Sequence, residues 1–145
     1  MYDPHQPEQW SGTNSYIHRA LAQQGIQIVD IGPLGVPWSL PSKARKLVYR
    51  LLGRQFLRDR QPGVARAYAA QVEKTLRQAA VELVFSPGTR EIAALSTRLP
   101  VAFWTDATFA GMVDVNPDFT RLCAESLRNG HALEQAALER CWLAL

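Results

Sequence analysis

The sequence lacks the features that define several large classes of protein. No run of about 18 apolar residues occurs, which excludes a transmembrane helix, and the polar, proline-bearing N-terminus has no secretory signal pattern. Neither the two cysteines nor the three histidines occur at metal-ligand spacing. There is no glycine-rich phosphate loop, and aromatic residues do not alternate with basic ones as in RNA-binding platforms. We therefore expect a cytoplasmic protein that holds no metal, no cofactor and no nucleic acid.

What the sequence does contain fits one domain with an uneven charge distribution. Its 145 residues are 47% hydrophobic and 20% charged, as in ordinary globular domains. The net charge is +3, but the segment Lys43–Arg60 contains seven basic residues and one acidic residue. Apolar residues at 44, 47, 48, 51 and 52 would form a stripe beside the basic one on a helix. This pattern fits either peripheral contact with an anionic membrane or the solvated outer face of a helix packed on the core.

Hydrophobic periodicity and turn residues predict helices that alternate with short strands. The predicted strands are 26–31, 81–85 and 100–104, and another begins within 141–145. The predicted helices are 13–24, 42–57 with Ser42 as N-cap, 62–80, 91–97, one that starts at 116–118, and one that runs to 140 after a break at Asn129-Gly130. Such alternation predicts an α/β fold, with a Rossmann-like, mostly parallel sheet and helices on both faces.

The first helix begins in an unusual place. The sequence WSGT forms a glycine-bearing turn at its start, and such turns normally follow a strand, yet only ten residues precede Ser11. We therefore expect residues 1–10 to be a polar lead-in, residues 11–145 to be a partial domain, and the first strand to lie upstream of Met1. Backbone N–H groups of Ser11, Gly12 and Thr13 at a helix N-terminus suit a phosphate, although Ser-Gly-Thr also serves as an ordinary cap.

Polar residues follow two of the predicted strands, at the edge where parallel α/β sheets bind ligands. Asp106 comes soon after strand 100–104, between Trp104 and Phe109. Its carboxylate suits work on a substrate, where it can orient a hydroxyl, accept a proton or stabilise a developing positive charge. The alternative is a carboxylate that binds backbone amides in a tight turn. The same edge holds further candidate ligand contacts: Ser86, Thr105, Thr108 and Phe109.

Four stretches of the sequence carry a family resemblance: WSGTNSYIHRALAQQGIQIVDIGPL, ELVFSPGTREIAAL, LPVAFWTDATFAGMVDVNPDF and ESLRNGHALEQAALERCWLAL. Together they resemble the N-terminal half of glycosyltransferase family 4 enzymes with the GT-B fold. The similarity runs from Trp10 to Leu145, apart from residues 36–66. Its most specific part is the occurrence of WSGT and WTDATF at this separation.

The resemblance implies a two-domain retaining enzyme that transfers a sugar from a nucleotide-sugar donor to a sugar or lipid acceptor. The N-terminal domain of such enzymes holds mainly the acceptor, and the loop matching Ser11–Thr13 faces the donor phosphates. Many members have a His-Asp pair after the strand matching 100–104, and the His contacts the donor sugar. Here Thr105 takes the place of that His and Asp106 follows it. Because the donor phosphate can itself take the acceptor's proton, the resemblance leaves electrostatic stabilisation of the sugar to Asp106.

The domain that grips the nucleotide would follow this segment, so the resemblance implies a piece truncated at both ends and inactive on its own. A second interpretation stays open: a non-catalytic, flavodoxin-like module that binds a small ligand or a partner. Coding sequence for a strand upstream and for another domain downstream would favour the enzyme. Stop codons close to both ends would favour the module.

Overall fold

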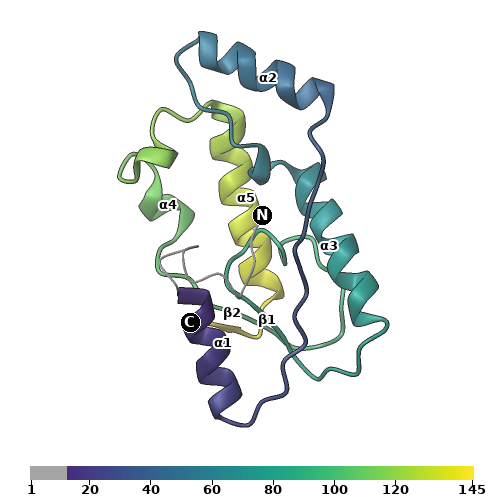
Figure 1. The fold of residues 1–145 in the computed structure, drawn as a ribbon. Coiled ribbons are helices and arrows are strands. Elements are labelled where there is room, and N and C mark those ends of the chain that lie inside the picture. Colours follow the sequence, from purple (N-terminus) through teal and green to yellow (C-terminus); the bar gives the residue numbers. More distant parts are fainter. Residues whose placement is uncertain (1–12) are drawn as a thin grey trace.

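The structure is a computed structural model that describes residues 13–145, with side chains described from residue 15 onward. Helices and strands follow one another as Figure 1 shows. The elements are α1 (Thr13–Gln23), α2 (Leu40–Leu51), the 3-10 helix η2 (Arg58–Arg60), α3 (Pro62–Leu76), β1 (Val84–Ser86), β2 (Val101–Phe103), α4 (Phe109–Met112), the 3-10 helix η3 (Pro117–Phe119), α5 (Ala124–Arg140) and β3 (Leu143–Ala144). This order confirms the α/β class predicted from the sequence.

The described strands form a small parallel sheet in the order β1-β2-β3. Val84 pairs with Val101, and Ala102 pairs with Leu143. The pairing continues past the strand ends, since the Trp104 N–H donates to the Ser86 carbonyl over 3.1 Å. The predicted strand at the C-terminal end of the sequence is thereby confirmed as β3, and the carboxyl ends of all three strands meet at one edge.

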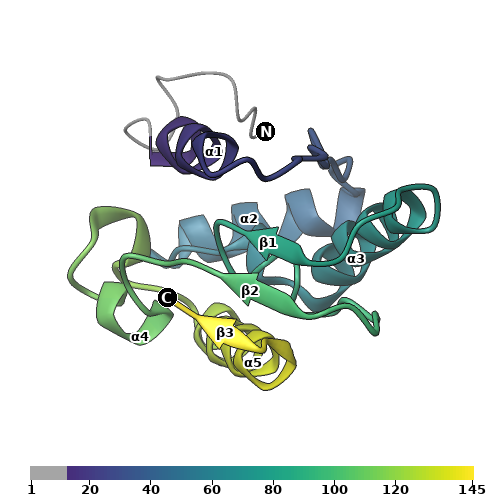
Figure 2. The same cartoon turned by 90° about the horizontal axis from the view of Figure 1, so that it is seen from below.

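The core lies between the sheet and the two long helices α3 and α5. Val84, Val101 and Phe103 contribute buried side chains from the strands. Small residues on the helices, including Ala65 of α3 and Ala137 of α5, let the backbones approach closely and are fully buried. Seen from below in Figure 2, the strands lie in front of α5, and no described helix covers the side nearer the viewer. Within the described residues, the long helices therefore cover one face of the sheet and not the predicted two.

The predicted end of the first helix is confirmed. Gly25 follows α1 with a φ of +77°, a left-handed conformation that glycine adopts without strain. The next residue, Ile26, donates its N–H back to the carbonyl of Leu21 over 3.3 Å. These two features form the Schellman arrangement, in which carbonyls at the helix end find partners just beyond it.

The predicted strand 26–31 does not form in the described structure. Its residues are extended but belong to no ladder, and Ile26 and Val29 are each 50% exposed. The β-branched pattern selects residues that suit a strand, but a strand also needs a neighbour to share its hydrogen bonds. No described strand runs beside this segment, which leads away from α1 beyond the β1 edge (Figures 1 and 2).

Three predicted helix boundaries and one predicted helix are wrong. Helix α3 ends at Leu76 and not at 80. Helix α2 starts three residues earlier than predicted, because Ser39 is the N-cap and its Oγ accepts the N–H of Ser42 over 3.3 Å. It ends at Leu51 and not at 57, since Gly53 adopts a φ of +66°. The predicted helix 91–97 is a series of turns that ends where Leu95 donates to the carbonyl of Ile92 over 3.0 Å.

The region from Asn116 to Gly130 departs most from the sequence prediction. Asn116 does cap a helical turn, but this turn is only η3. It ends at the extended backbone of Thr120, and Arg121 follows with a positive φ of 49°. The long helix α5 starts at Ala124, with Cys123 as its N-cap, and passes without a break through Asn129 and Gly130. The predicted break at Asn129-Gly130 is therefore wrong.

Packing explains why a glycine stands in the middle of α5. A Cβ atom built on Gly130 would lie 2.1 Å from the Cζ atom of the Phe109 ring. The ring of Phe109, at the start of α4, thus lies directly against the backbone of α5. Gly130 is required by this close approach and does not mark the end of a helix.

Candidate functional site

The carboxyl edge of the sheet brings together the two loops that the sequence predicted to be neighbours. The loop after β1 begins at Ser86 and the loop after β2 begins at Trp104, and the backbone bond between these two residues holds them side by side. On the other side, the Thr105 N–H donates to the carbonyl of Leu145 over 3.1 Å. The edge therefore has a fixed backbone on which the side chains that follow β2 are presented.

Asp106 is the free carboxylate of this edge. It lies in a bend after β2 and its side chain is exposed. Among the residues that the structure describes, it has neither a hydrogen bond nor an ion pair. The alternative expectation, a carboxylate consumed by backbone amides of a tight turn, is not what the structure shows.

The turn around Asp106 is held by its threonine neighbours. The Thr105 hydroxyl donates to the carbonyl of Ala107 over 2.8 Å. Thr108 is the N-cap of α4, and its Oγ1 accepts the N–H of Gly111 over 3.0 Å. Both hydroxyls therefore fix the local backbone, and Thr108 remains exposed.

Phe109 anchors the loop to the body of the protein. Its side chain is fully buried, and the ring lies edge-on to the rings of Phe119 and His131, with centroids 5.9 and 5.1 Å away. Its backbone N–H donates to Oε1 of Glu134 over 2.7 Å. Because no part of the Phe109 ring reaches solvent, its predicted contact with a ligand is not available in this structure.

Four predicted ligand-binding residues remain. Ser86 follows β1, and Ser11, Gly12 and Thr13 lie near the start of the chain. Ser86 is 4% exposed, and its hydroxyl donates to the carbonyl of Gly88 over 2.8 Å. The Ser86 hydroxyl is therefore buried and bonded within the loop after β1. Ser11 and Gly12 lie outside the described residues, and Thr13 is the first residue of α1.

Neither Arg60 nor Arg90 was identified from the sequence as a residue near the candidate site. Arg60 is 7% exposed, and its guanidinium lies 5.1 Å from the Phe109 ring centroid and 5.8 Å from that of Phe119. Its Nε and Nη1 atoms have no hydrogen-bond partner among the described residues. Burial lowers the pKa of Arg60, although the carboxylates of Asp59 and Glu134 oppose this change.

A second arginine joins the loop after β1 to η2. Arg90 bridges two carboxylates, since its Nη1 lies 2.8 Å from Oδ2 of Asp59 and its Nη2 lies 3.4 Å from Oε1 of Glu91. Burial lowers the pKa of Arg90, but Glu91 and Asp59 outweigh this effect and leave the pKa raised. The guanidinium of Arg90 is thus paired with two carboxylates, and Asp106 takes no part in these ion pairs.

The basic segment Lys43–Arg60 does not form one surface. Arg60 is buried, and Arg58 is half-buried and donates from Nη2 to the carbonyls of Val36 and Pro37. The five basic residues that precede them are exposed: Lys43, Arg45, Lys46, Arg50 and Arg54. The basic surface is accordingly smaller than the sequence suggested and belongs to α2 and the turn after it.

Asp106 lines neither of two open cavities of the described structure. One, of about 320 Å³, lies between the end of α3 and the segment before β2 and is lined by Glu73, Leu76, Arg77, Ala79, Val81, Ser96, Thr97, Arg98 and Leu99. The other, of about 360 Å³, lies beneath α2 and is lined by Val36, Pro37, Ser39, Pro41, Ser42, Arg45, Phe56, Arg58, Gln61, Pro62, Gly63 and Val64. Both therefore lie away from the loop after β2.

Comparisons with known proteins provide no assignment: no protein-family model, no curated protein and no solved structure matches this chain. Within residues 13–145, no group of three or more His, Cys, Asp and Glu side chains is arranged to hold a metal ion. None of the described helices is long and apolar enough to cross a membrane.

Proposed function

We propose that this chain forms the acceptor side of a retaining glycosyltransferase, which passes a sugar from a nucleotide-sugar donor to a sugar or lipid acceptor. The resemblance to glycosyltransferase family 4 motivates the reaction class. The parallel α/β sheet supports the location of the site, because such sheets bind ligands beyond the carboxyl ends of their strands. The observation that carries the proposal is the exposed, unpaired carboxylate of Asp106 at that edge.

The proposed chemistry requires positioning and charge, not a cofactor. An acceptor hydroxyl forms a bond to the anomeric carbon of the donor sugar while the bond from that carbon to the phosphate oxygen breaks. The proton of the hydroxyl passes to the departing phosphate oxygen. Positive charge develops on the sugar ring during this exchange, and a fixed negative charge beside it lowers the barrier. Asp106 is suited to this task, since no described cation neutralises it and its neighbours Thr105 and Thr108 fix the turn.

The proposal is tested with the full-length product of the gene and a panel of UDP-sugars and GDP-sugars. We expect one member of the panel to bind in calorimetry with a Kd of about 1 μM to 1 mM, in the range usual for enzyme substrates. We also expect nucleotide release from the same donor when octyl glycosides are added as acceptors. No heat of binding with any donor would contradict the assignment.

A non-catalytic ligand-binding module is the second candidate, because an open cavity of about 360 Å³ beneath α2 lies away from Asp106. Hydrogen exchange with the bound donor distinguishes the two candidates. Protection of residues 104–109 is expected for the glycosyltransferase. Protection confined to residues 36–64, with no nucleotide release, would support the module.

A further inference from the structure

Helix α2 is the outermost element of the described structure and presents an amphipathic surface that the proposed transferase site does not use. It crosses the end of the molecule opposite the sheet, above α5 and α3 (Figure 1). None of its residues is buried. An ordinary surface helix turns its apolar side toward the core, so the position of the apolar side of α2 needs an explanation.

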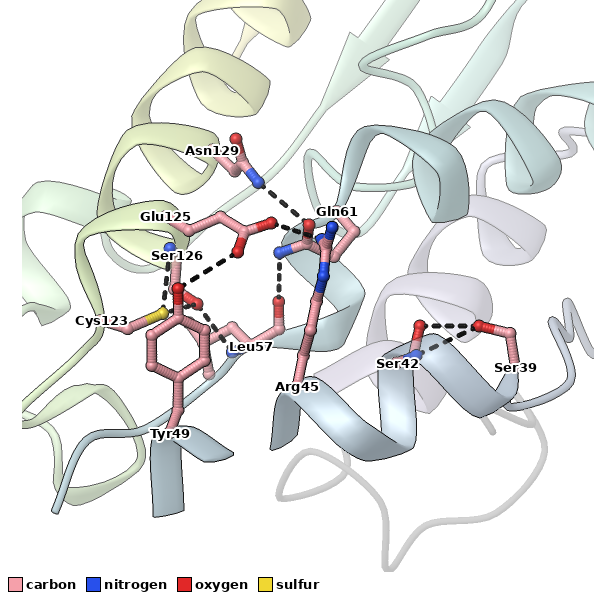
Figure 3. Close-up of polar contacts among 10 residues, drawn as sticks. All are labelled: Ser39, Ser42, Arg45, Tyr49, Leu57, Gln61, Cys123, Glu125, Ser126 and Asn129. Carbon is pink, nitrogen blue, oxygen red and sulfur yellow. Dashed lines mark hydrogen bonds and ion pairs between the residues drawn. The ribbon is translucent and has the colours of Figure 1, made fainter. Parts of the chain in front are cut away.

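The face of α2 that points to the body is polar. Arg45 donates from Nη1 to Oε1 of Glu125 over 2.8 Å, and the Tyr49 hydroxyl lies 3.5 Å from Oε2 of the same carboxylate. Figure 3 shows both side chains reaching from α2 toward Glu125, in the first turn of α5. The Tyr49 ring also stacks on Phe56, with centroids 5.8 Å apart. These contacts fix which side of α2 faces inward.

The opposite side of α2 is apolar and open to solvent. Leu40 is 81% exposed and Leu51 is 79% exposed. At 100° per residue, these leucines lie on the far side of the helix from Tyr49. We call this surface the outer stripe; it consists of Leu40, Ala44, Leu47, Val48 and Leu51, all of them exposed. The amphipathic helix is thus oriented with its apolar side outward.

Basic side chains border the outer stripe, and no acidic residue occurs in α2. Lys43, Lys46 and Arg50 lie along one flank, between the stripe and the inward face, and all three are exposed. Lys46 also lies near Trp38, with Nζ 5.2 Å from the ring centroid, and Trp38 is partly exposed. Leucine on one face and cations on its flank are typical of helices that lie in the interface of an anionic membrane.

We propose that the outer stripe of α2 docks on an anionic lipid bilayer, with Lys43, Lys46 and Arg50 among the phosphate headgroups. The shape of the surface favours this occupant. A helix of 12 residues is about 18 Å long, and α2 lies across the end of the molecule, so its whole length can meet a planar surface. The contacts to Glu125 keep the stripe facing outward while it does so. This inference does not depend on the proposed transferase reaction.

Vesicle co-sedimentation of the full chain tests the proposal. The probes are vesicles of phosphatidylcholine alone and of equal parts phosphatidylcholine and phosphatidylglycerol. We expect binding to the anionic vesicles that weakens as salt is added. Each cation near an anionic surface contributes about a fivefold gain in partitioning. The variant Lys43→Gln/Lys46→Gln/Arg50→Gln should therefore bind about a hundredfold more weakly.

The apolar contribution is tested separately with Leu47→Gln/Leu51→Gln. These side chains are exposed, so the variant should fold as the parent does, and we expect it to lose about a hundredfold in partitioning. Matched controls remove the same charge or apolar area elsewhere. They are Arg66→Gln/Arg77→Gln/Arg128→Gln and Val115→Gln/Leu138→Gln, all at exposed positions outside α2. Both control variants should bind anionic vesicles as the parent does.

Three results would overturn the proposal. The first is no binding to anionic vesicles, and the second is equal binding to neutral and anionic vesicles. The third is equal loss of binding in the α2 variants and their matched controls. A dimer in sedimentation equilibrium that Leu47→Gln/Leu51→Gln abolishes, without any vesicle binding, would assign the stripe to a second copy of the chain instead.

Discussion

At the scale of single residues, the packing of α4 against α5 depends on the absence of a side chain at Gly130. Replacing Gly130 with alanine would place a Cβ atom 2.1 Å from Phe109 Cζ, and the fully buried ring has no room to move. We expect Gly130→Ala to lower the free energy of unfolding by at least about 2 kcal/mol, as overpacked cores do. Urea unfolding followed by circular dichroism measures this change.

Gly63 is the matched control for that substitution. It lies in α3, and apart from its chain neighbours and the backbone of its own helix no atom lies within 4 Å of a Cβ built on it. Because alanine favours a helix over glycine, Gly63→Ala should raise the free energy of unfolding by up to about 1 kcal/mol. Equal effects of the two substitutions would contradict the packing described for Phe109 and Gly130.

The buried arginine gives a second prediction at this scale. Arg60 holds two nitrogen atoms away from water without hydrogen bonds to described residues, which is an unfavourable arrangement. Methionine is shorter but likewise unbranched, needs no hydration and makes favourable contacts with aromatic rings. We expect Arg60→Met to raise the free energy of unfolding by about 1 kcal/mol. A decrease of about 3 kcal/mol or more would show that the carboxylates of Asp59 and Glu134 depend on this cation.

At the scale of secondary-structure elements, the attachment of α2 to α5 should respond to alkaline pH. Partial desolvation and the neighbouring Cys123 and Glu125 raise the pKa of the Tyr49 phenol. The folded-state pKa therefore lies above that of the unfolded chain, which is about 10. The stability linked to Tyr49 is complete below pH of about 10 and is lost as the pH rises through the folded-state value.

Comparison of the parent with Tyr49→Phe tests this dependence, since phenylalanine keeps the stacking on Phe56 but cannot ionise. The free energy of unfolding of the parent should fall relative to that of Tyr49→Phe as the pH rises above about 10. A difference between the two proteins that does not change with pH would contradict the account. So would a Tyr49 phenolate that appears below pH of about 10 in a difference absorbance titration.

Local signals predicted the elements that depend on local interactions. Helix α3 begins at Pro62 as expected, and α1 ends before Gly25, because a proline in the first turn and a left-handed glycine act on their own neighbours. The predicted break in α5 failed because Gly130 is required by Phe109, a residue 21 positions away that meets it only in the folded chain. The strand 26–31 failed because pairing depends on another strand.

In the candidate site too, local features could be predicted from the sequence and tertiary contacts could not. The sequence predicted that Asp106 follows a buried strand, and in the structure Asp106 is exposed at the carboxyl edge. The burial of Arg60 and the hydrogen bond to the Glu134 carboxylate could not be predicted from the sequence. Arg60 lies within a basic segment that resembles a surface, and Glu134 acts on the backbone of Phe109 from another helix.

At the scale of the whole molecule, the structure separates two surfaces that the account assigns to different partners. The carboxyl edge of the sheet carries the unpaired carboxylate of Asp106. Helix α2, at the other end of the molecule in Figure 1, carries the outer stripe and its basic flank. Because the two surfaces lie at opposite ends of the molecule (Figure 1), each proposal has its own test.

The role of Asp106 is tested by the turnover of full-length Asp106→Asn with the donor identified by calorimetry. Asparagine keeps the shape of the side chain and removes its charge, and the exposed position should leave the melting temperature unchanged. Asp118→Asn, an exposed carboxylate in η3, is the matched control. We predict that Asp106→Asn lowers kcat by about a hundredfold or more while the control keeps the parent rate. Turnover of Asp106→Asn within a factor of about three of the parent, less than 1 kcal/mol in barrier, would contradict the account.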